Sequence, residues 1–287
     1  MSMARYERVL RVLAPAVLLA VVGCGGGGGD AAGGGGGGDA APAEMPFDVA
    51  TAGNITGSVT FEGTPPPPEV LDMTSEADCA ATYTGDPEVS WVDVGGGGLA
   101  DVFVYVREGL EGMSFPVPGQ AVVIDQQGCQ YRPLVAGVQV GQSVAFRNSD
   151  GLLHNINASP TANRPFNVSQ PVNMDTEREF AAPEVMIPIQ CDVHGWMAGY
   201  IGVVTHPYHT VSGGSGAFDL SQLPPGEYVI EAWHARLGTL EQTVTVTTGQ
   251  TAEVTFNFTD AMLSSAGTPT DGPHDHRTMA RVGGVAE

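Results

Sequence analysis

Lysine is absent from this sequence, and positive charge is scarce throughout. All 11 basic residues are arginines, and they face 32 acidic residues, which gives a formal net charge of −21 at pH 7. Nucleic-acid binding needs a basic surface for the phosphate backbone, so we do not expect this chain to bind nucleic acid. Anionic lipid headgroups would also repel it, unless a separate device attaches it to a membrane.

Long hydrophobic runs and amphipathic helices are also lacking. The longest apolar run covers residues 12–22, which is too short to span a bilayer, since a spanning helix takes about 20 residues. Residues 68–81 are the one weak helical candidate. Hydrophobic residues nevertheless make up 42% of the chain, with 40 Gly and 21 Pro, so we expect a globular core with many turns.

The N-terminal segment has the layout of an export signal. Three arginines precede the apolar run, which ends in Val-Val-Gly-Cys at residues 21–24 and there resembles a bacterial lipobox. The resemblance implies that residues 1–23 are removed and that Cys24 is lipidated, which would anchor the protein to a membrane. An ordinary signal peptide with a spare cysteine is the alternative. We therefore expect an exported bacterial lipoprotein, on the periplasmic face of the membrane or at the cell surface. Gly25 follows Cys24 at the position where an aspartate would indicate inner-membrane retention, which slightly favours the outer membrane.

Two loosely patterned ends flank a region of alternating hydrophobicity. Residues 24–49 are Gly-rich and are expected to form a flexible tether, and residues 259–287 are expected to be a disordered tail. Short strand-like segments separated by Gly and Pro turns fill the region between them. This pattern predicts an all-β fold, and the complete new set of strands after His206 predicts two sandwiches, covering residues 50–206 and 207–258.

The strongest chemical signal is the pattern C-x-x-H-x-x-M, formed by Cys191, His194 and Met197. A thiolate, an imidazole and a thioether on one tight loop between two apolar strands suit copper. A fourth ligand must come from elsewhere, and His154, at the start of another expected strand, is the candidate. Two His and one Cys with a weak axial Met form the blue-copper arrangement, so we predict one type 1 copper held by these four residues.

Other chemistries fit this segment less well. Cys191 and His194 could be a nucleophile and its base, but the Met spacing and the upstream His-Asn pair argue against it. Zinc prefers four strong donors, for which a thioether is a poor substitute. Trp196 is expected to pack over the site, with a docking or electron-transfer role as the rarer alternative. A single type 1 site lacks the further His cluster of a copper oxidase, so we expect no enzyme and no catalytic residue.

Together these residues resemble the cupredoxin family, of the plastocyanin and amicyanin type. His154-Asn155 matches the strand that carries the first ligand of that family, and C-x-x-H-x-x-M matches the short ligand loop of the amicyanin-like members. The resemblance implies a Greek-key sandwich with copper at one end, and it implies that Asn155 braces the ligand loop by hydrogen bonding. Residues 62–100, Pro-rich and then Gly-rich, depart from the family pattern and are expected to form an inserted loop over one edge.

Two cysteines remain once Cys24 and Cys191 are assigned. Cys79 lies in the inserted loop, and Cys129 lies in a Gly-Cys turn. In an exported chain an even remainder suggests a disulfide, which would fasten the inserted loop to the sandwich; two free thiols are the alternative.

Residues 207–258 resemble a different family. The turn L-P-P-G-x-Y at residues 223–228, between two expected strands, resembles the carboxypeptidase regulatory-like (transthyretin-like) sandwich, which implies a non-catalytic module. The two-part layout resembles methylamine-utilisation-type exported proteins. Histidines at 206, 209 and 234, or at 274 and 276 in the tail, could form another metal site, but structural roles are the favoured interpretation.

Two functions follow from these expectations. The first is a membrane-tethered one-electron carrier whose partner is a cytochrome or oxidoreductase with a basic patch, approaching the exposed edge of a ligand histidine. The alternative is a copper-binding or structural module without electron transfer, in which the transthyretin-like domain binds a partner or a glycan. Rapid redox cycling without loss of metal would separate the two.

Overall fold

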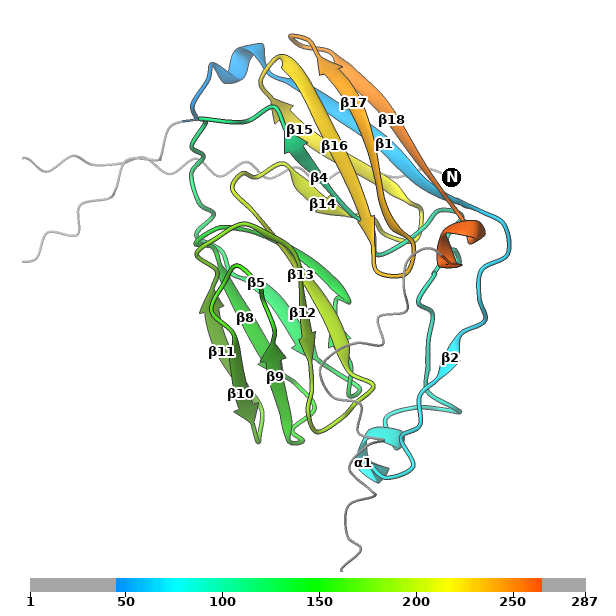
Figure 1. Ribbon diagram of the computed structural model, residues 1–287. Coiled ribbons are helices and arrows are strands. Elements are labelled where there is room, and N and C mark those ends of the chain that lie inside the picture. Colours follow the sequence, from blue (N-terminus) through cyan, green and yellow to red (C-terminus); the bar gives the residue numbers. More distant parts are fainter. Residues whose placement is uncertain (1–44, 265–287) are drawn as a thin grey trace, which may run out of the picture. The chain divides into compact units, whose positions relative to one another are not determined.

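The structure is a computed structural model that describes residues 45–264. Nearly all regular elements in that range are strands, which confirms the predicted all-β class (Figure 1). The strands are β1 (Gly53–Glu62), β2 (Glu69–Val70), β3 (Glu88–Val89), β4 (Phe103–Glu108), β5 (Val122–Gln126), β6 (Tyr131–Arg132), β7 (Val135–Gln139), β8 (Ser143–Asn148), β9 (His154–Ala158), β10 (Phe166–Gln170), β11 (Met174–Glu179), β12 (Glu184–Gln190), β13 (Ala198–Val204), β14 (His209–Val211), β15 (Ala217–Leu223), β16 (Gly226–His234), β17 (Gly238–Val246) and β18 (Thr251–Thr259).

Within residues 45–264, helical structure is limited to three short elements. The weak helical candidate at residues 68–81 contains only α1 (Ala77–Ala80), because its first residues form β2 and an irregular connection. Two 3₁₀ turns, η1 (Val49–Thr51) and η2 (Asp260–Ser264), lie near the ends of the described range. No helix within residues 45–264 is long and apolar enough to cross a membrane.

Nine strands between residues 122 and 204 build the sandwich that carries the predicted metal ligands. One sheet has the order β10-β9-β12-β13-β7 and the other has the order β11-β8-β5-β6. Their inward side chains share one apolar core, which includes Phe146, Ile156, Ile187 and Ile201, all 0% exposed. Every second side chain of a strand points to the same face of its sheet, and these residues lie on the inner faces.

The remaining long strands build a second sandwich. Its sheets have the orders β15-β1-β18 and β14-β4-β16-β17. Their core includes Ile55, Val104, Phe218 and Phe256. In the L-P-P-G-x-Y turn the Tyr228 hydroxyl donates to the Pro224 carbonyl at 2.6 Å, so the tyrosine fastens the turn that precedes its own strand.

The strand pairing differs from the division expected at His206. We expected residues 50–206 to form one sandwich, but β1 pairs with β15 and β18, and β4 pairs with β14 and β16. The second sandwich therefore takes two strands from the N-terminal side of the first. Local periodicity does not identify these partners, because the pairing joins segments far apart in the sequence.

Residues 62–100 consequently connect two strands of the second sandwich and are not an insertion within the first. The connection leaves β1, carries β2, α1 and β3, and returns to β4 (Figure 1). The predicted disulfide is present, with Cys79 of α1 bonded to Cys129 in the turn between β5 and β6. We call residues 69–89 the cap segment, because this bond holds them against the metal-ligand sandwich.

Folded structure extends past both predicted limits. Met45 and Phe47, expected in the tether, pack against the core of the second sandwich. At the other end β18 reaches Thr259, and Met262 in η2 packs on the same core. Cys24, the proposed signal peptide, the rest of the tether, and His274 and His276 lie outside the described residues.

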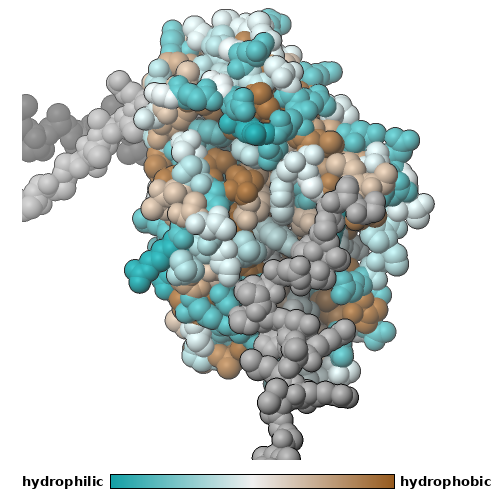
Figure 2. Space-filling view, viewed as in Figure 1, coloured by the Kyte–Doolittle hydropathy of each residue, from teal (hydrophilic) through white to brown (hydrophobic). Residues whose placement is uncertain are grey.

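Large apolar side chains in the described range are mostly gathered into these cores. On the face seen in Figure 2, hydrophilic residues are interspersed with smaller hydrophobic areas. The exposed large hydrophobic residues come from several separate segments, among them Val70, Val117, Val172 and Val193. Scattered exposed residues of this kind are normal for a folded protein and mark no interface by themselves.

Candidate metal centre

The segment between β12 and β13 forms a tight loop that holds three of the four predicted ligands. The Cys191 amide donates to the Met197 carbonyl at 3.1 Å, and the Met197 amide donates to the His194 carbonyl at 2.9 Å. All three side chains are buried, with exposures of 2% for Cys191, 2% for His194 and 1% for Met197. The two strands therefore fix both ends of the loop and turn its soft donors inward.

His154 reaches the same place from β9. Its side chain is 0% exposed, and its Nδ1 lies 2.9 Å from Nδ1 of His194. The sulfur of Cys191 lies 3.7 Å from that same His194 nitrogen. Atoms that share one ion at about 2 Å each lie roughly 3–4 Å apart, so this spacing suits a bound metal. The donor atoms of His154, Cys191 and His194 form one of the groups that could hold an ion.

Asp150, which the sequence interpretation did not single out, contacts the His154 ring nitrogen that points away from His194. Its Oδ2 lies 2.9 Å from Nε2 of His154 and also accepts a hydrogen bond from the Cys129 amide at 2.8 Å. Its Oδ1 accepts from the Gly128 amide at 2.6 Å. A carboxylate at Nε2 keeps a proton on that nitrogen, so Nδ1 is the nitrogen that would bind a metal once its own proton is displaced. The only sequence signal was its position, four residues before His154 in an expected turn.

Asn155 connects β9 to the ligand loop, as the family resemblance implied. Its Oδ1 accepts from the Asp192 amide at 2.5 Å, and its Nδ2 donates to the Asp192 carboxylate at 3.0 Å. Asn157 and Asn167 donate to the same carboxylate, at 2.9 and 2.6 Å. Asp192 is thus held by three asparagines, which fixes the residue next to Cys191.

The electrostatics of the centre favour a thiolate beside a charged imidazole. Burial raises the pKa of Cys191, but hydrogen bonds from His154, His194 and the backbone amides of Asn155 and His194 lower it to about 6. Burial lowers the pKa of His154, but its bonds to Asp150 and Cys191 raise it to about 9. Metal binding must therefore displace a proton from His154, and it meets a sulfur that is already deprotonated at neutral pH.

The outer edge of His194 is covered, which contradicts the expectation of an exposed ligand edge. Its Nε2 lies 3.7 Å from the sulfur of Cys79 and 3.9 Å from Oε2 of Glu76, both in the cap segment. The Trp196 ring lies 5.2 Å from the His194 ring, and its Nε1 donates to the Cys129 carbonyl at 3.0 Å. The cap segment and Trp196 together enclose the imidazole.

The histidines of the second sandwich do not form a metal group with one another. His206 donates from Nε2 to the Val106 carbonyl at 2.8 Å, and His234 accepts from the Arg236 amide at 3.1 Å. His209 packs on the Phe103 ring with centroids 5.7 Å apart. Within residues 45–264, the groups of closely spaced metal donors include none of these three histidines, which supports their structural interpretation.

Comparison with known proteins gives no family assignment. No family model and no curated protein matches the chain. Among solved structures, a purple cupredoxin from Nitrosopumilus maritimus is 22% identical with a TM-score of 0.25, covering 29% of this chain and 98% of that one. An oxidised mutant of amicyanin is 18% identical with a TM-score of 0.27, covering 35% and 97%. The copper nitrite reductase of Thermus scotoductus is 21% identical with a TM-score of 0.28, covering 34% and 25%.

Proposed function

We propose that this protein is an exported, lipid-anchored type 1 copper protein that carries single electrons. One observation carries the proposal: Nδ1 of His154, Sγ of Cys191 and Nδ1 of His194 converge in a buried site, with Met197 buried on the same loop. No catalytic residue is required for this function. The acidic chain, with its net charge of −21, suits a partner that presents a basic patch.

The donor set fits copper better than zinc. Two imidazoles and one thiolate can form a trigonal plane, and a thioether is a weak axial donor that copper tolerates. Zinc in a structural site takes four strong donors, which Met197 does not supply. When bound, copper supplies a one-electron couple, and His154, Cys191, His194 and Met197 are the residues that would hold it.

The surrounding residues keep the donors in place whichever charge the site carries. Asp150 fixes the ring of His154, and Asn155 fixes the start of the ligand loop through Asp192. Backbone amides of Asn155 and His194 donate to the Cys191 sulfur. Because the donors are buried and hydrogen-bonded before metal arrives, little rearrangement is needed when the charge of the site changes.

The test is visible absorption and electron spin resonance of the purified protein loaded with Cu(II). We expect an intense blue thiolate-to-copper band that a mild reductant bleaches and an oxidant restores. Cys191→Ser should abolish the band, whereas His206→Gln, which keeps a donor for the Val106 carbonyl, should retain it. Copper bound without the band would mean that Cys191 is not a ligand, and the absence of stoichiometric binding would reject the proposal.

A second function is favoured by the covered edge of His194. A site enclosed by a disulfide-held segment suits a protein that retains copper as a structural or captured ion, while the second sandwich, which we propose to be transthyretin-like, recognises a partner or glycan. Repeated reduction and reoxidation separates the two functions. A carrier should pass many cycles at full copper content, and a retention protein should react slowly or lose the metal.

A further inference from the structure

Because His194 is enclosed, a redox partner protein must approach the metal centre from another side. With its imidazole 2% exposed beneath the cap segment, a protein partner cannot touch the His194 edge. Trp196 is the half-buried member of the ligand loop whose ring lies 5.2 Å from that imidazole. A partner that reaches Trp196 is therefore one ring away from a predicted ligand.

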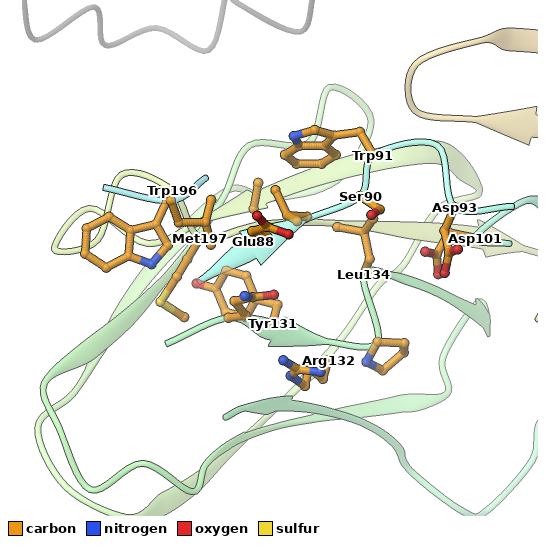
Figure 3. A pocket seen from close by; sticks show the side chains of 15 residues that line it. Glu88, Ser90, Trp91, Asp93, Asp101, Tyr131, Arg132, Leu134, Trp196 and Met197 are labelled. Carbon is orange, nitrogen blue, oxygen red and sulfur yellow. The ribbon is translucent and has the colours of Figure 1, made fainter. Parts of the chain in front are cut away.

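A cavity of about 430 Å³ opens beside Trp196. We call it the Trp196 cavity. Its lining comes from a residue next to β2, from β3 and the residues after it, from Asp101 shortly before β4, from β6 and its neighbours, and from the ligand loop. Trp196 and Met197 lie at one end of the cavity, and Asp93 and Asp101 lie side by side at the other (Figure 3). Its volume falls in the range of pockets that receive a small molecule or a long side chain.

Charge on the cavity wall has one dominant sign. Glu88, Asp93 and Asp101 bring three carboxylates, and Arg132 is the one cationic residue among the lining. The Arg132 Nε already donates to the Gln127 carbonyl at 3.3 Å. Burial and the neighbouring charge of Asp93 raise the pKa of Asp101. The two carboxylates therefore repel each other, and a cation between them would offset this repulsion.

The aromatic geometry of the cavity wall agrees with a cationic occupant. Trp91 on the same wall already stacks with the guanidinium of Arg236, 4.5 Å from its ring centroid. A positive group over an aromatic ring is attracted by the negative face of the ring.

We propose that the Trp196 cavity is the docking site for an arginine or lysine side chain presented by the redox partner. This inference rests on the proposed electron-carrier function and locates its partner on the chain. The inserted cation would lie between Asp93 and Asp101, and the partner surface would cover Trp196. One electron would then pass between the one-electron centre of the partner and the metal site, with Trp196 as the contact between them.

The first experiment needs no copper. The metal-free protein is titrated with a blocked tetra-arginine peptide and with its citrulline analogue, which has the same shape without charge, while tryptophan fluorescence and calorimetry follow binding. We expect the arginine peptide to bind at least about 10-fold more tightly than the analogue, with an affinity that falls as salt rises. Equal affinity for the two peptides would overturn the proposal.

Variants then place the binding in the cavity. Asp93→Asn with Asp101→Asn should weaken the arginine peptide at least about 10-fold. The matched control, Glu227→Gln with Glu253→Gln, removes the same charge from exposed positions of the second sandwich and should weaken it less than about 2-fold. Equal weakening by both pairs would mean that only net charge acts, and it would overturn the cavity as the site. If the double variant fails to fold, Asp93→Asn and Asp101→Asn are tested singly against Glu227→Gln and Glu253→Gln.

A third measurement separates this inference from the proposed function. Reduction of the copper-loaded protein by a basic c-type cytochrome is followed by stopped flow, with Trp196→Phe as the variant. We expect slower electron transfer at unchanged peptide affinity, since phenylalanine leaves Asp93 and Asp101 in place and keeps an aromatic side chain, but its smaller ring leaves a wider gap to His194. A blue, redox-active protein in which neither peptide binding nor Trp196→Phe has an effect would leave the carrier standing and reject the docking site. A protein that binds the peptide but no copper would reject the carrier.

Discussion

His154 of the metal centre and the histidines of the second sandwich are buried or half-buried, yet their pKa values are shifted in opposite directions. Burial lowers the pKa of His154, yet Asp150 and Cys191 raise it to about 9. Burial lowers the pKa values of His206, His209 and His234 to about 4, and no carboxylate offsets it. The partner of a buried histidine, and not its burial alone, therefore decides whether it is charged in the metal-free protein or a neutral part of the core.

Substituting one histidine from each sandwich is the most severe test of this comparison. His154→Asn removes one donor from the metal centre, so copper affinity should fall more than about 100-fold, beyond the effect of losing a supporting residue. His234→Asn keeps an acceptor for the Arg236 amide, so copper affinity should be unchanged while the free energy of unfolding falls by about 0.5–3 kcal/mol. Competition with a copper chelator and urea unfolding of the metal-free protein measure the two effects.

An equal loss of copper in both variants would break the comparison. It would show that a histidine of the second sandwich contributes to a metal site, which the spacing of the described donors does not indicate.

Removing the disulfide tests what the cap segment does for the centre. Cys79→Ser with Cys129→Ser frees α1 from the turn that carries Cys129, and the loss of a disulfide costs about 2–4 kcal/mol of stability. It should also uncover His194, so copper should pass to a chelator faster. The matched control is Tyr83→Phe, which removes two hydrogen bonds between the same two segments and should cost about 1–3 kcal/mol. The Tyr83 hydroxyl donates to the Gly128 carbonyl at 2.6 Å and accepts from the Gln130 side-chain amide at 2.8 Å. Unchanged copper release in the serine variant would mean that the cap does not limit access.

Asp150→Asn isolates the partner that raises the pKa of His154. The amide keeps the shape of the side chain but removes its charge, so copper affinity should fall about 10–100-fold and the pKa of His154 should fall below its value of about 9. Copper competition and NMR titration of the metal-free protein check both. Asp175→Asn, an exposed carboxylate bonded to Arg147, is the control and should leave both quantities unchanged.

The sequence could predict the parts of the centre that are local in the chain. Cys191, His194 and Met197 lie on one short loop, and their spacing alone predicts that three donors belong to the same metal site. His154 was found because a histidine opens an alternating strand. Asp150 and the covering of His194 could not be found in this way. Asp150 is held by the turn that carries Cys129, and the covering depends on the disulfide between that turn and the cap segment, so both involve segments that are remote in sequence.

The fold shows the same limit. Strand positions follow from alternation, and β9 covers the predicted residues. The partners of β1 and β4 do not follow, because β1 runs parallel to β18 at the other end of the folded region. Pairing over such a distance is decided by which apolar faces share a core, and Ile55 and Phe256 meet there only in three dimensions.

The smallest expected effect concerns the pH dependence of unfolding in the metal-free protein. His206, His209 and His234 have pKa values of about 4 when folded, against about 6.5 when unfolded, so the unfolded chain binds more protons between those values. Their contribution to stability is fully present above pH 6.5 and is lost as pH falls through 4. His154 has the opposite sign, since its raised pKa stabilises the fold below pH 6.5 and this contribution is lost as pH rises through about 9.

In His206→Gln the slope of unfolding free energy between pH 4 and 6.5 should drop by at most about 1.4 kcal/mol per pH unit, the value of one proton. An unchanged slope would mean that His206 takes up its proton without unfolding, so that the contrast between the two sets of histidines would not hold at this position.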